Sequence, residues 1–430
     1  MVTRANAASD KTLTSWIDIP ENSDFSIYNI PFGVFRTSLT GPRCCSRIGD
    51  YIVDLRVLAE HEYFKSANIS PSIFDKEHLN EFIALGKLKT NKIRERLIEL
   101  FSAENHELQD NRAIHASVLY KHEMVNMVLP IRIGNYTDFY SSQEHATNVG
   151  TMFRDPNNAL LPNWKHLPVA YHGRASSIVV SGTPVNRPHG QFKKNKDDPA
   201  PTFGPTQALD YELEVALVIG KNSTLGEAIA IENADEYIFG FLLFNDWSAR
   251  DIQSWEYVPL GPFLSKNFIS SVSPWIITAE ALGPFRTKGP AQDIQLLPYL
   301  QCNGDSLLNY DIELEVDLQV SGKEAECVSR TNFKYMYWNV YQQIAHHTIN
   351  GCNVSVGDLM ASGTISGPTR DSVGSLLELT RNGREPLVLK NGSVRKFLED
   401  GDTVIMKAFA SKDGVRVGFG EVMGKVIGNR

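Results

Sequence analysis

The sequence has few cysteines and no long hydrophobic run. Its cysteines are Cys44, Cys45, Cys302, Cys327 and Cys352, an odd set without the spacing of a metal site. Free cysteines are typical of a reducing compartment. No apolar stretch approaches the length that crosses a bilayer, and the opening MVTRANAASDKTLTSW lacks the apolar core of a signal peptide. We therefore expect a cytoplasmic protein that does not contact a membrane.

The sequence also lacks an excess of positive charge. The chain has 42 basic and 50 acidic residues, a formal net charge of −8, and no basic stripe. Nucleic acids are bound mainly through clustered positive charge, so a nucleic-acid partner is not expected. With 430 residues, of which 42% are hydrophobic, the chain is long enough for one large or two ordinary cores.

The pattern along the chain changes near residue 130. Residues 25–60 read as short strands, with a hairpin at Gly49-Asp50, and residues 72–128 read as mainly helical. Strands broken by Gly and Pro follow. We predict a small N-terminal β/α unit over 1–130 and a larger, mostly β catalytic unit over 131–430.

Two further segments carry structural expectations. The Pro- and Lys-rich stretch Arg187 to Thr206 reads as a long surface loop. Asn332 to Asn350 reads as one helix, ended by Gly351. His346 and His347 lie at its C-terminal end, where histidines commonly interact with the helix dipole or with solvent.

The stretch LDYELEVALVIG (209–220) places carboxylates on a strand that is otherwise apolar. Asp210, Glu212 and Glu214 share one face, which continues as Ala216 and Val218. Burying neighbouring carboxylates is costly unless a cation neutralises them. The pattern is therefore compatible with a metal or catalytic site, and the alternative is a solvated strand edge.

The chain repeats this phrase as DIELEVDLQV (311–320). Here Glu313 and Glu315 have the same spacing, but their face stays polar through Asp317 and Gln319. This alternation is typical of a half-buried strand with a solvated side. The second copy therefore predicts a structural strand, and the contrast favours a site in the first.

The segment FNDWSARDIQSWEYVP offers groups that could accompany those carboxylates. Asp246 ends a strand, and the helix that follows places Arg250, Gln253 and Tyr257 on one face. Lys266 ends the next apolar run. The alternatives are that Asp246 or Ser248 only caps the helix and that the polar face is solvated.

A third segment, NYTDFYSSQEHATNVG, offers a candidate base. Ser141 to Glu144 fits a capping box, and His145 follows in the first helical turn, where an imidazole tends to stay neutral. In LLELT, Glu378 is expected within a strand and is a candidate partner for His145. The alternative is a structural histidine.

Asp138, Glu212, Glu214 and Asp246 would together form an all-oxygen site. Such a site prefers Mg²⁺ or Ca²⁺ to zinc. Lys266 and Arg250 could offset the remaining negative charge.

Seven motifs give the chain a resemblance to the fumarylacetoacetate hydrolase family. They are DFYSSQEHATNVG, LPVAYHGRASS, DYELEV, FNDWSARDIQ, GPFLSKNF, GDLMASGTISGP and GFGEVMGKV, spread over about Trp16 to Val426. The N-terminal unit favours the branch that carries such a unit. The resemblance implies an SH3-like N-terminal domain, a mixed β-roll catalytic domain and a homodimer.

The resemblance also implies roles for particular residues. Ca²⁺ or Mg²⁺ would lie at Asp138, Glu212, Glu214 and Asp246, with Lys266 and Ser270 also at the metal site; the family usually has threonine at Ser270. Substrate contacts would come from Tyr140, Arg154, Tyr171, Gln253, Tyr257 and Thr364. His145 would be the general base, oriented by Glu378, while Arg250, Gln253 and Lys266 would stabilise the departing carbanion and the oxyanion.

The implied reaction is hydrolysis of a carbon–carbon bond in 4-fumarylacetoacetate to fumarate and acetoacetate, the last step of tyrosine and phenylalanine degradation. The alternatives are a relative acting on another oxo acid (an acylpyruvate hydrolase, a decarboxylase or a hydratase) and a non-catalytic metal-binding protein. The intact His145 and Glu378, together with the N-terminal unit, argue against both.

Overall fold

The N-terminal unit is built on a five-stranded antiparallel sheet. The computed structural model describes residues 13–195, 197–302 and 306–428. In the order β4-β3-β2-β1-β5 the strands are Leu119–Lys121, Tyr51–Asp54, Arg43–Ile48, Phe32–Arg36 and Asn126–Val128. The order and the antiparallel pairing are those of an SH3-like sheet, as predicted. Gly49, at φ +51°, forms the predicted hairpin between β2 and β3.

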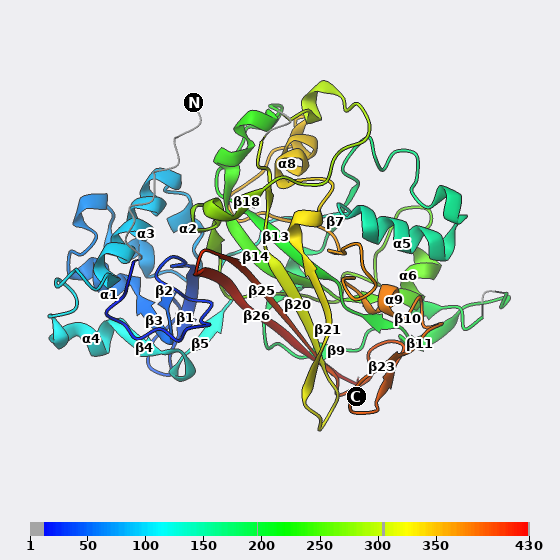
Figure 1. Ribbon diagram of the computed structural model, residues 1–430, viewed down its shortest axis with the longest axis horizontal. Coiled ribbons are helices and arrows are strands. Elements are labelled where there is room, and N and C mark those ends of the chain that lie inside the picture. The colour runs from blue at the N-terminus through cyan, green and yellow to red at the C-terminus, as the bar shows by residue number, and fades with distance from the viewer. Residues whose placement is uncertain (1–12, 196, 303–305, 429–430) are drawn as a thin grey trace.

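Helices cover the outside of this sheet (Figure 1). They are α1 Leu55–Glu60, α2 Asn80–Ile83, α3 Lys87–Phe101 and α4 Arg112–Val118. In α3 an apolar stripe is fully buried, including Ile93, Leu97 and Leu100. The predicted helical texture between residues 72 and 128 is therefore confirmed in part, with short strands at its end.

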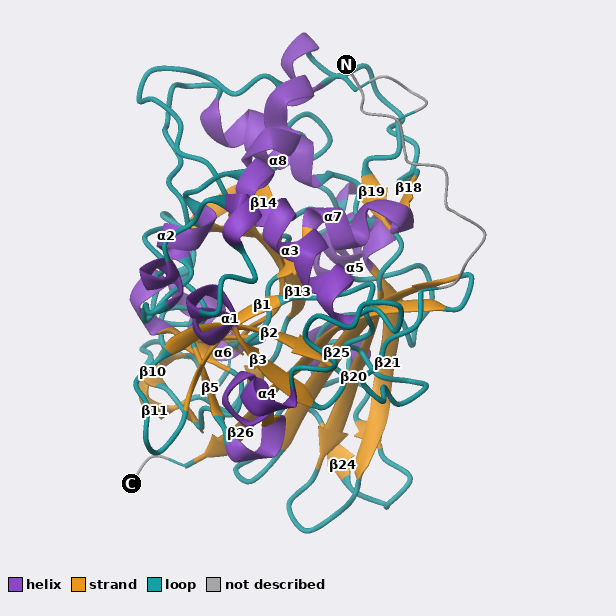
Figure 2. Cartoon of the chain, turned by 90° about the vertical axis from the view of Figure 1, so that its left-hand side faces the viewer, coloured by secondary structure: helices purple, strands orange, loops and turns teal. Residues whose placement is uncertain are grey.

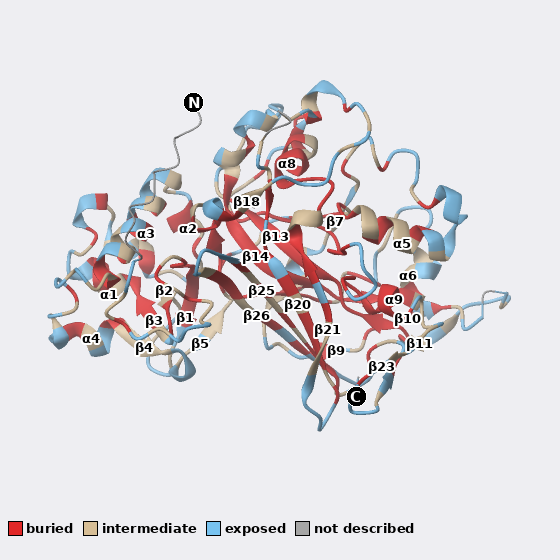
Figure 3. Cartoon of the chain, in the orientation of Figure 1, coloured by how far each residue is buried: buried red, intermediate tan, exposed pale blue. Residues whose placement is uncertain are grey.

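An eight-stranded mixed sheet forms the centre of the larger unit. Along β7-β6-β22-β13-β14-β16-β8 its strands are Ala170–Gly173, Tyr136–Phe139, Leu359–Ala361, Leu213–Ile219, Ile238–Asp246, Ser270–Val272 and Ile178–Val180, and β17 (Ile277–Thr278) pairs with β14. Strands β22 and β6 run parallel, as do β16 and β8. The central strand β13 is buried along its whole length (Figure 3).

A second sheet packs against one face of this central sheet. In the order β21-β20-β25-β26-β9 its strands are Ala325–Asn332, Glu313–Gln319, Thr403–Lys412, Val415–Ile427 and Val185–Asn186. Leu213, Val215 and Leu217 of β13 belong to the core between the two sheets. Ala216 and Val218, on the other face, belong to a core shared with the N-terminal unit. The predicted mostly β, two-unit architecture is therefore confirmed.

The remaining helices lie around these sheets. They are α5 Gln143–Phe153, α6 Arg250–Glu256, α7 Ala279–Leu282, α8 Val340–Thr348 and α9 Leu376–Leu379. Figure 2 shows α8 at the opposite end of the molecule from β24. The short paired strands are β10–β11 (His189–Phe192, Thr202–Pro205), β12–β15 (Leu209–Asp210, Ser248–Ala249), β18–β19 (Arg286–Thr287, Asn309–Tyr310) and β23–β24 (Leu387–Val388, Val394–Arg395). No helix in the described part of the chain is long and apolar enough to span a membrane.

Three local predictions were wrong. Arg187 to Thr206 is a loop only in part, because β10 and β11 pair as a projecting hairpin with Gly190 opposite Gly204. The predicted helix Asn332 to Asn350 is shorter, since α8 begins after Asn339. The Asn339 side chain accepts from the N–H groups of Tyr341 and Gln342 and caps the helix there. Glu378 lies in helix α9 rather than in a strand, because the Ser375 side chain caps a helical turn at that point.

Candidate active site

Four buried carboxylates meet where the central strands end. Asp138 comes from β6, Glu212 precedes β13, Glu214 lies in β13 and Asp246 ends β14. One oxygen of each lies within 4.8 Å of the others. Glu214 and Asp246 are fully buried, and Glu212 is 5% exposed. Of the two interpretations left open for the first copy of the phrase, the solvated edge is therefore excluded.

Two cations contact this cluster. Lys266 Nζ donates to Glu212 and, at 2.7 Å, to Asp246 Oδ2. Arg250 Nη1 donates to Glu212 Oε1 at 2.7 Å. Burial alone would raise the pKa of Glu212, but Lys266 and Arg250 outweigh it and hold that pKa below its ordinary value. Glu212 is therefore neutralised by the protein itself.

Asp138 and Glu214 are not neutralised in this way. Burial raises the pKa of both well above the ordinary value, and neighbouring carboxylates raise it further. Among the described residues, Asp138 Oδ1 and Glu214 Oε1 find no hydrogen-bond partner although both are buried. Unpaired buried carboxylate oxygens are rare and costly. These oxygens and the all-oxygen donor set fit a hard divalent cation.

The sheet holds these groups in register. Ser270 of β16 lies opposite Asp246 and donates to its Oδ1 at 2.8 Å. The Tyr171 hydroxyl donates to Asp246 Oδ2 at 2.9 Å. Gly363 donates its N–H to Glu214 Oε2 at 3.1 Å. Its φ is +77°, and a Cβ at this position would collide with the carbonyl oxygen of Phe139, so there is no room for a side chain.

His145 and Glu378 are in contact. Their Nδ1 and Oε2 atoms lie 2.7 Å apart, and both side chains are buried. The Glu378 carboxylate also accepts from Asn148, Ser366 and Ser375 at 2.8–3.0 Å. Burial would raise the pKa of Glu378, but His145, Asn148 and Ser375 bring it below its ordinary value. An ionised Glu378 fixes the proton on Nδ1 and leaves Nε2 as an acceptor.

Helix α5 begins one residue later than predicted. Its N-cap is Ser142 rather than Ser141, and the Ser142 side chain accepts from His145 N at 3.1 Å. With Ser142 as the N-cap, the third residue of the helix is His145 rather than Glu144. The predicted capping box between Ser141 and Glu144 is therefore not formed. Ser142 also donates to Ser366 O, which ties the base-bearing helix to the segment that supports Glu378. Helix α6 likewise begins after Ala249, so neither Asp246 nor Ser248 is its cap.

These groups open on a cavity of about 680 Å³. Its lining includes all the residues predicted as substrate contacts, together with the base and both cations: Tyr140, His145, Arg154, Tyr171, Arg250, Gln253, Tyr257, Lys266 and Thr364. Arg250 Nη2 is buried there without a partner among the described residues. Glu214, Asp246, Ser270 and Glu378 lie behind the lining and support it.

Sequence reasoning missed several residues that hold the site together. Asp210 accepts from Arg250 Nε at 2.9 Å and from the N–H groups of Leu376 and Leu377, so it joins the cation to helix α9. Its place on the same face as Glu212 was the available signal. Asn148 lies one turn after His145, and that spacing could have indicated it. Ser366 and Ser375 gave no comparable signal.

This fold and site define a class of protein. Residues 135–427 match the family model "Fumarylacetoacetate (FAA) hydrolase C-terminal", and residues 28–130 match "Fumarylacetoacetase N-terminal". The chain belongs to the fumarylacetoacetate hydrolase family.

Individual relatives are similar over nearly their whole length. The chain is 50% identical to the fumarylacetoacetase of Dictyostelium discoideum over 420 residues, covering 96% of this chain and 98% of the relative. It is 49% identical to the human fumarylacetoacetase over 415 residues, with the same coverage. Among solved structures, a fumarylacetoacetate hydrolase from Exiguobacterium antarcticum matches with a TM-score of 0.51 at 18% identity, covering 93% of this chain and 100% of that one. That match shows the shared fold.

Proposed function

We propose that this protein is an enzyme that hydrolyses 4-fumarylacetoacetate to fumarate and acetoacetate. Support comes from the fumarylacetoacetases described above. They are 50% and 49% identical to this chain and cover 96% of it. The observation that carries the proposal is the His145–Glu378 pair, whose histidine lines the same cavity as Arg250 and Lys266. A base and fixed cations on one cavity suit the hydrolysis of a β-diketone.

The base would act on water. With the proton on Nδ1 held by Glu378, His145 Nε2 can accept a proton as water oxygen adds to the carbonyl carbon of the fumaryl part. The bond from that carbon to the neighbouring methylene carbon then breaks. Its electron pair leaves with the acetoacetate part as an enolate, which takes up a proton. One water is consumed, and two carboxylic acids result.

Negative charge develops on oxygen in both steps. Fixed donors in a water-poor site stabilise such charge without reorganising, typically by several kcal/mol. Arg250 is suited to this, because Nε and Nη1 are anchored while Nη2 has no partner in the described structure. Lys266 is anchored on two carboxylates, whose charge outweighs burial and raises its pKa, so the ammonium stays charged.

We propose that Asp138, Glu212, Glu214 and Asp246 hold Ca²⁺ or Mg²⁺. The donor set is all oxygen, and two of those oxygens otherwise lack partners among the described residues. When bound, such an ion would polarise the diketone oxygens and favour the enolate charge. Tyr140, Arg154, Tyr171, Gln253, Tyr257 and Thr364 are proposed substrate contacts, and Ser270 is a proposed neighbour of the ion.

A homodimer and a cytoplasmic location also remain proposals. Exposed apolar side chains gather beside the cavity mouth, with Leu260 96% and Phe263 66% exposed, and a second copy of the chain could cover them. Light scattering on the wild type and on Leu260→Asp/Phe263→Asp would test this. The five cysteines are all free, which suits a reducing compartment.

Turnover is the test of the proposed reaction. Purified protein with Mg²⁺ or Ca²⁺ should remove the enol absorbance of fumarylacetoacetate and release equal amounts of fumarate and acetoacetate. Absence of turnover, or products other than these two acids, would contradict the proposal.

A further inference from the structure

A second cavity, here called the rear cavity, lies behind the strands that carry Asp138. Thr137 lines the rear cavity and Asp138 lines the catalytic cavity. Neighbouring residues of a strand point to opposite faces, so β6 and β7 form a wall between the two. The rear cavity has a volume of about 300 Å³, near the lower limit for small-molecule sites.

Three of the polar side chains of the rear cavity are imidazoles. His172 comes from β7, and His346 and His347 come from the end of α8. Asn350 and Cys352 lie on the loop that follows, while Phe139, Leu167 and Pro168 are among the apolar lining. None of the described lining residues is an aspartate, glutamate, lysine or arginine. Such a lining would not repel an anion.

Each helical histidine has one nitrogen already fixed. His347 Nε2 lies 3.0 Å from Thr137 Oγ1, and its Nδ1 is buried without a partner in the described structure. His346 Nδ1 lies 3.0 Å from the Tyr299 hydroxyl. These contacts orient both rings. The orphaned Nδ1 of His347 is a buried polar atom that a ligand could satisfy.

The environment also suits proton uptake with an anion. Burial lowers the pKa of His346, and burial together with His172 lowers that of His347. Tyr171 and Cys352 are the other titratable groups on the cavity, and Tyr299 lies behind His346, so no carboxylate of the described lining competes for the imidazoles. A bound anion would favour the charged imidazole, and binding should therefore tighten as the pH falls.

We propose that the rear cavity is a second ligand site, which binds a small carboxylate through His172, His346 and His347. The site is separate from the catalytic groups, but Phe139, Val169, Ala170 and Tyr171 line both cavities. A ligand there would contact the side of β6 and β7 that faces away from Asp138. The proposal does not depend on the reaction proposed above.

Histidine NMR can locate such binding directly. The chain has 11 histidines, and histidine labelled with carbon-13 at Cε1 would give one ring signal from each. Fumarate and acetoacetate serve as the probes, titrated separately at pH 6 and pH 8. His346 and His347 report on the rear cavity, and single His→Gln variants assign their signals. His145 reports on the catalytic cavity.

We expect the signals of His346 and His347 to shift with a saturating curve whose midpoint rises severalfold from pH 6 to pH 8. His172→Gln, at an exposed position, should raise the ligand concentration at the midpoint for His346 and His347 and leave the midpoint for His145 unchanged. His106, exposed and beside Asp110, is the control that should not move.

Two results would overturn the proposal. One is a titration in which His346 and His347 do not respond. The other is a midpoint shared with His145 that His172→Gln does not alter, because the wall would then only transmit binding in the catalytic cavity. A silent His145 with responsive rear histidines would instead count against the proposed reaction alone.

Discussion

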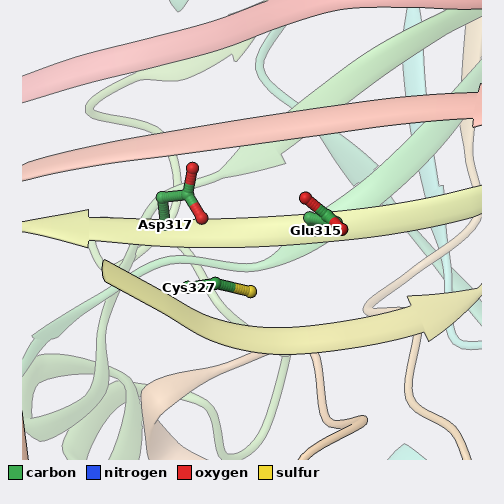
Figure 4. A group of neighbouring side chains, drawn as sticks. All are labelled: Glu315, Asp317 and Cys327. Atoms are coloured by element: carbon green, nitrogen blue, oxygen red, sulfur yellow. The ribbon is translucent and has the colours of Figure 1, made fainter. Parts of the chain in front are cut away.

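Strands β13 and β20 carry nearly the same phrase in different surroundings. On β20, Glu315 accepts from Arg330 at 2.8 Å and Asp317 accepts from Lys407 at 2.8 Å. Figure 4 shows Glu315 and Asp317 on β20, with Cys327 on the neighbouring strand. Each of these carboxylates has its own cation near the sheet surface. On β13, Glu214 has no cation contact among the described residues and is fully buried, with one oxygen unpaired.

The comparison teaches that proximity of acids does not by itself make a site. Glu315, Asp317 and Cys327 also lie close enough to share an ion, as the Asp138 cluster does. The difference is that β13 is buried on both faces, whereas on β20 the face opposite Leu314 is only partly covered. There Glu313 is exposed and Glu315 is half-buried, while Asp317 is buried and paired with Lys407. Burial without pairing turns the same phrase into a candidate metal site.

The largest expected effect concerns the proposed base, His145, which lies near β13 and has no counterpart near β20 among the described residues. His145→Ala should lower kcat by about two to four orders of magnitude, because the group that accepts the proton from water is lost. Metal binding and the thermal midpoint should change little. Turnover is compared with that of His106→Ala. Near wild-type turnover in the His145 variant would place the base elsewhere.

The next effect compares the two strands directly. Glu214→Gln should reduce divalent-metal affinity and kcat/KM by at least about tenfold to a hundredfold, since it removes a charged ligand. Glu315→Gln should leave both within about twofold. Calorimetric titration with Mg²⁺ and Ca²⁺ measures the metal affinity of both variants, and turnover assays measure their kcat/KM. Equal losses in the two variants would break the contrast.

A smaller effect concerns the support of Glu378. Asn148→Ala removes a donor to that carboxylate, so the pKa of Glu378 should rise from its lowered value. Glu378 must be ionised to hold His145, and the acid limb of the pH–rate profile should therefore move to higher pH. At pH 8 the rate should fall by up to about tenfold.

The matched control for that variant is Thr151→Ala on the same helix. The Thr151 hydroxyl donates only to Asn148 O in the described structure. Its pH profile should match that of the wild type. An unmoved acid limb in Asn148→Ala would show that the donor does not set the ionisation of Glu378.

The smallest effect is on stability and should differ in sign between the strands. Burial and Asp138 raise the pKa of Glu214, so the folded, metal-free protein binds a proton more tightly than the unfolded chain. Its stability then falls as the pH rises above the ordinary carboxyl range. Glu214→Gln should remove this loss and stabilise the metal-free protein at pH 8. Glu315→Gln should instead lower stability only slightly, because its partner Arg330 is largely exposed.

Urea unfolding at pH 5 and pH 8, with chelator present, measures the change in the free energy of unfolding for both variants. Glu214→Gln should be more stable than the wild type mainly at pH 8. Destabilisation of that variant at both pH values would mean that its carboxylate is paired in the folded protein.

Much of this architecture was accessible from the sequence. The alternation in β13 and β20, the hairpin at Gly49 and the buried stripe of α3 follow from local periodicity, and the structure confirms them. The set Asp138, Glu212, Glu214 and Asp246 was proposed from carboxylates in separate segments, and the resemblance implied the same set. Periodicity cannot bring together groups about a hundred residues apart.

The errors have a common physical origin. Glu378 was expected in a strand within LLELT, yet the Ser375 cap and Asp210 fix that turn as helical. Asp210 lies 166 residues away, so this contact is invisible locally. The same holds for Ser366, which reaches Glu378 through a bend in the chain.

The central claim is that the unpaired carboxylates of β13 exist to hold an ion on which turnover depends. The direct measurement is turnover by chelator-treated protein shown to be metal-free by elemental analysis and folded by circular dichroism. We expect no turnover, full recovery with Mg²⁺ or Ca²⁺, and poor recovery with Zn²⁺, whose preference is for nitrogen and sulfur ligands. Full activity in the folded, metal-free protein would contradict the account and leave the chemistry to His145, Arg250 and Lys266 alone.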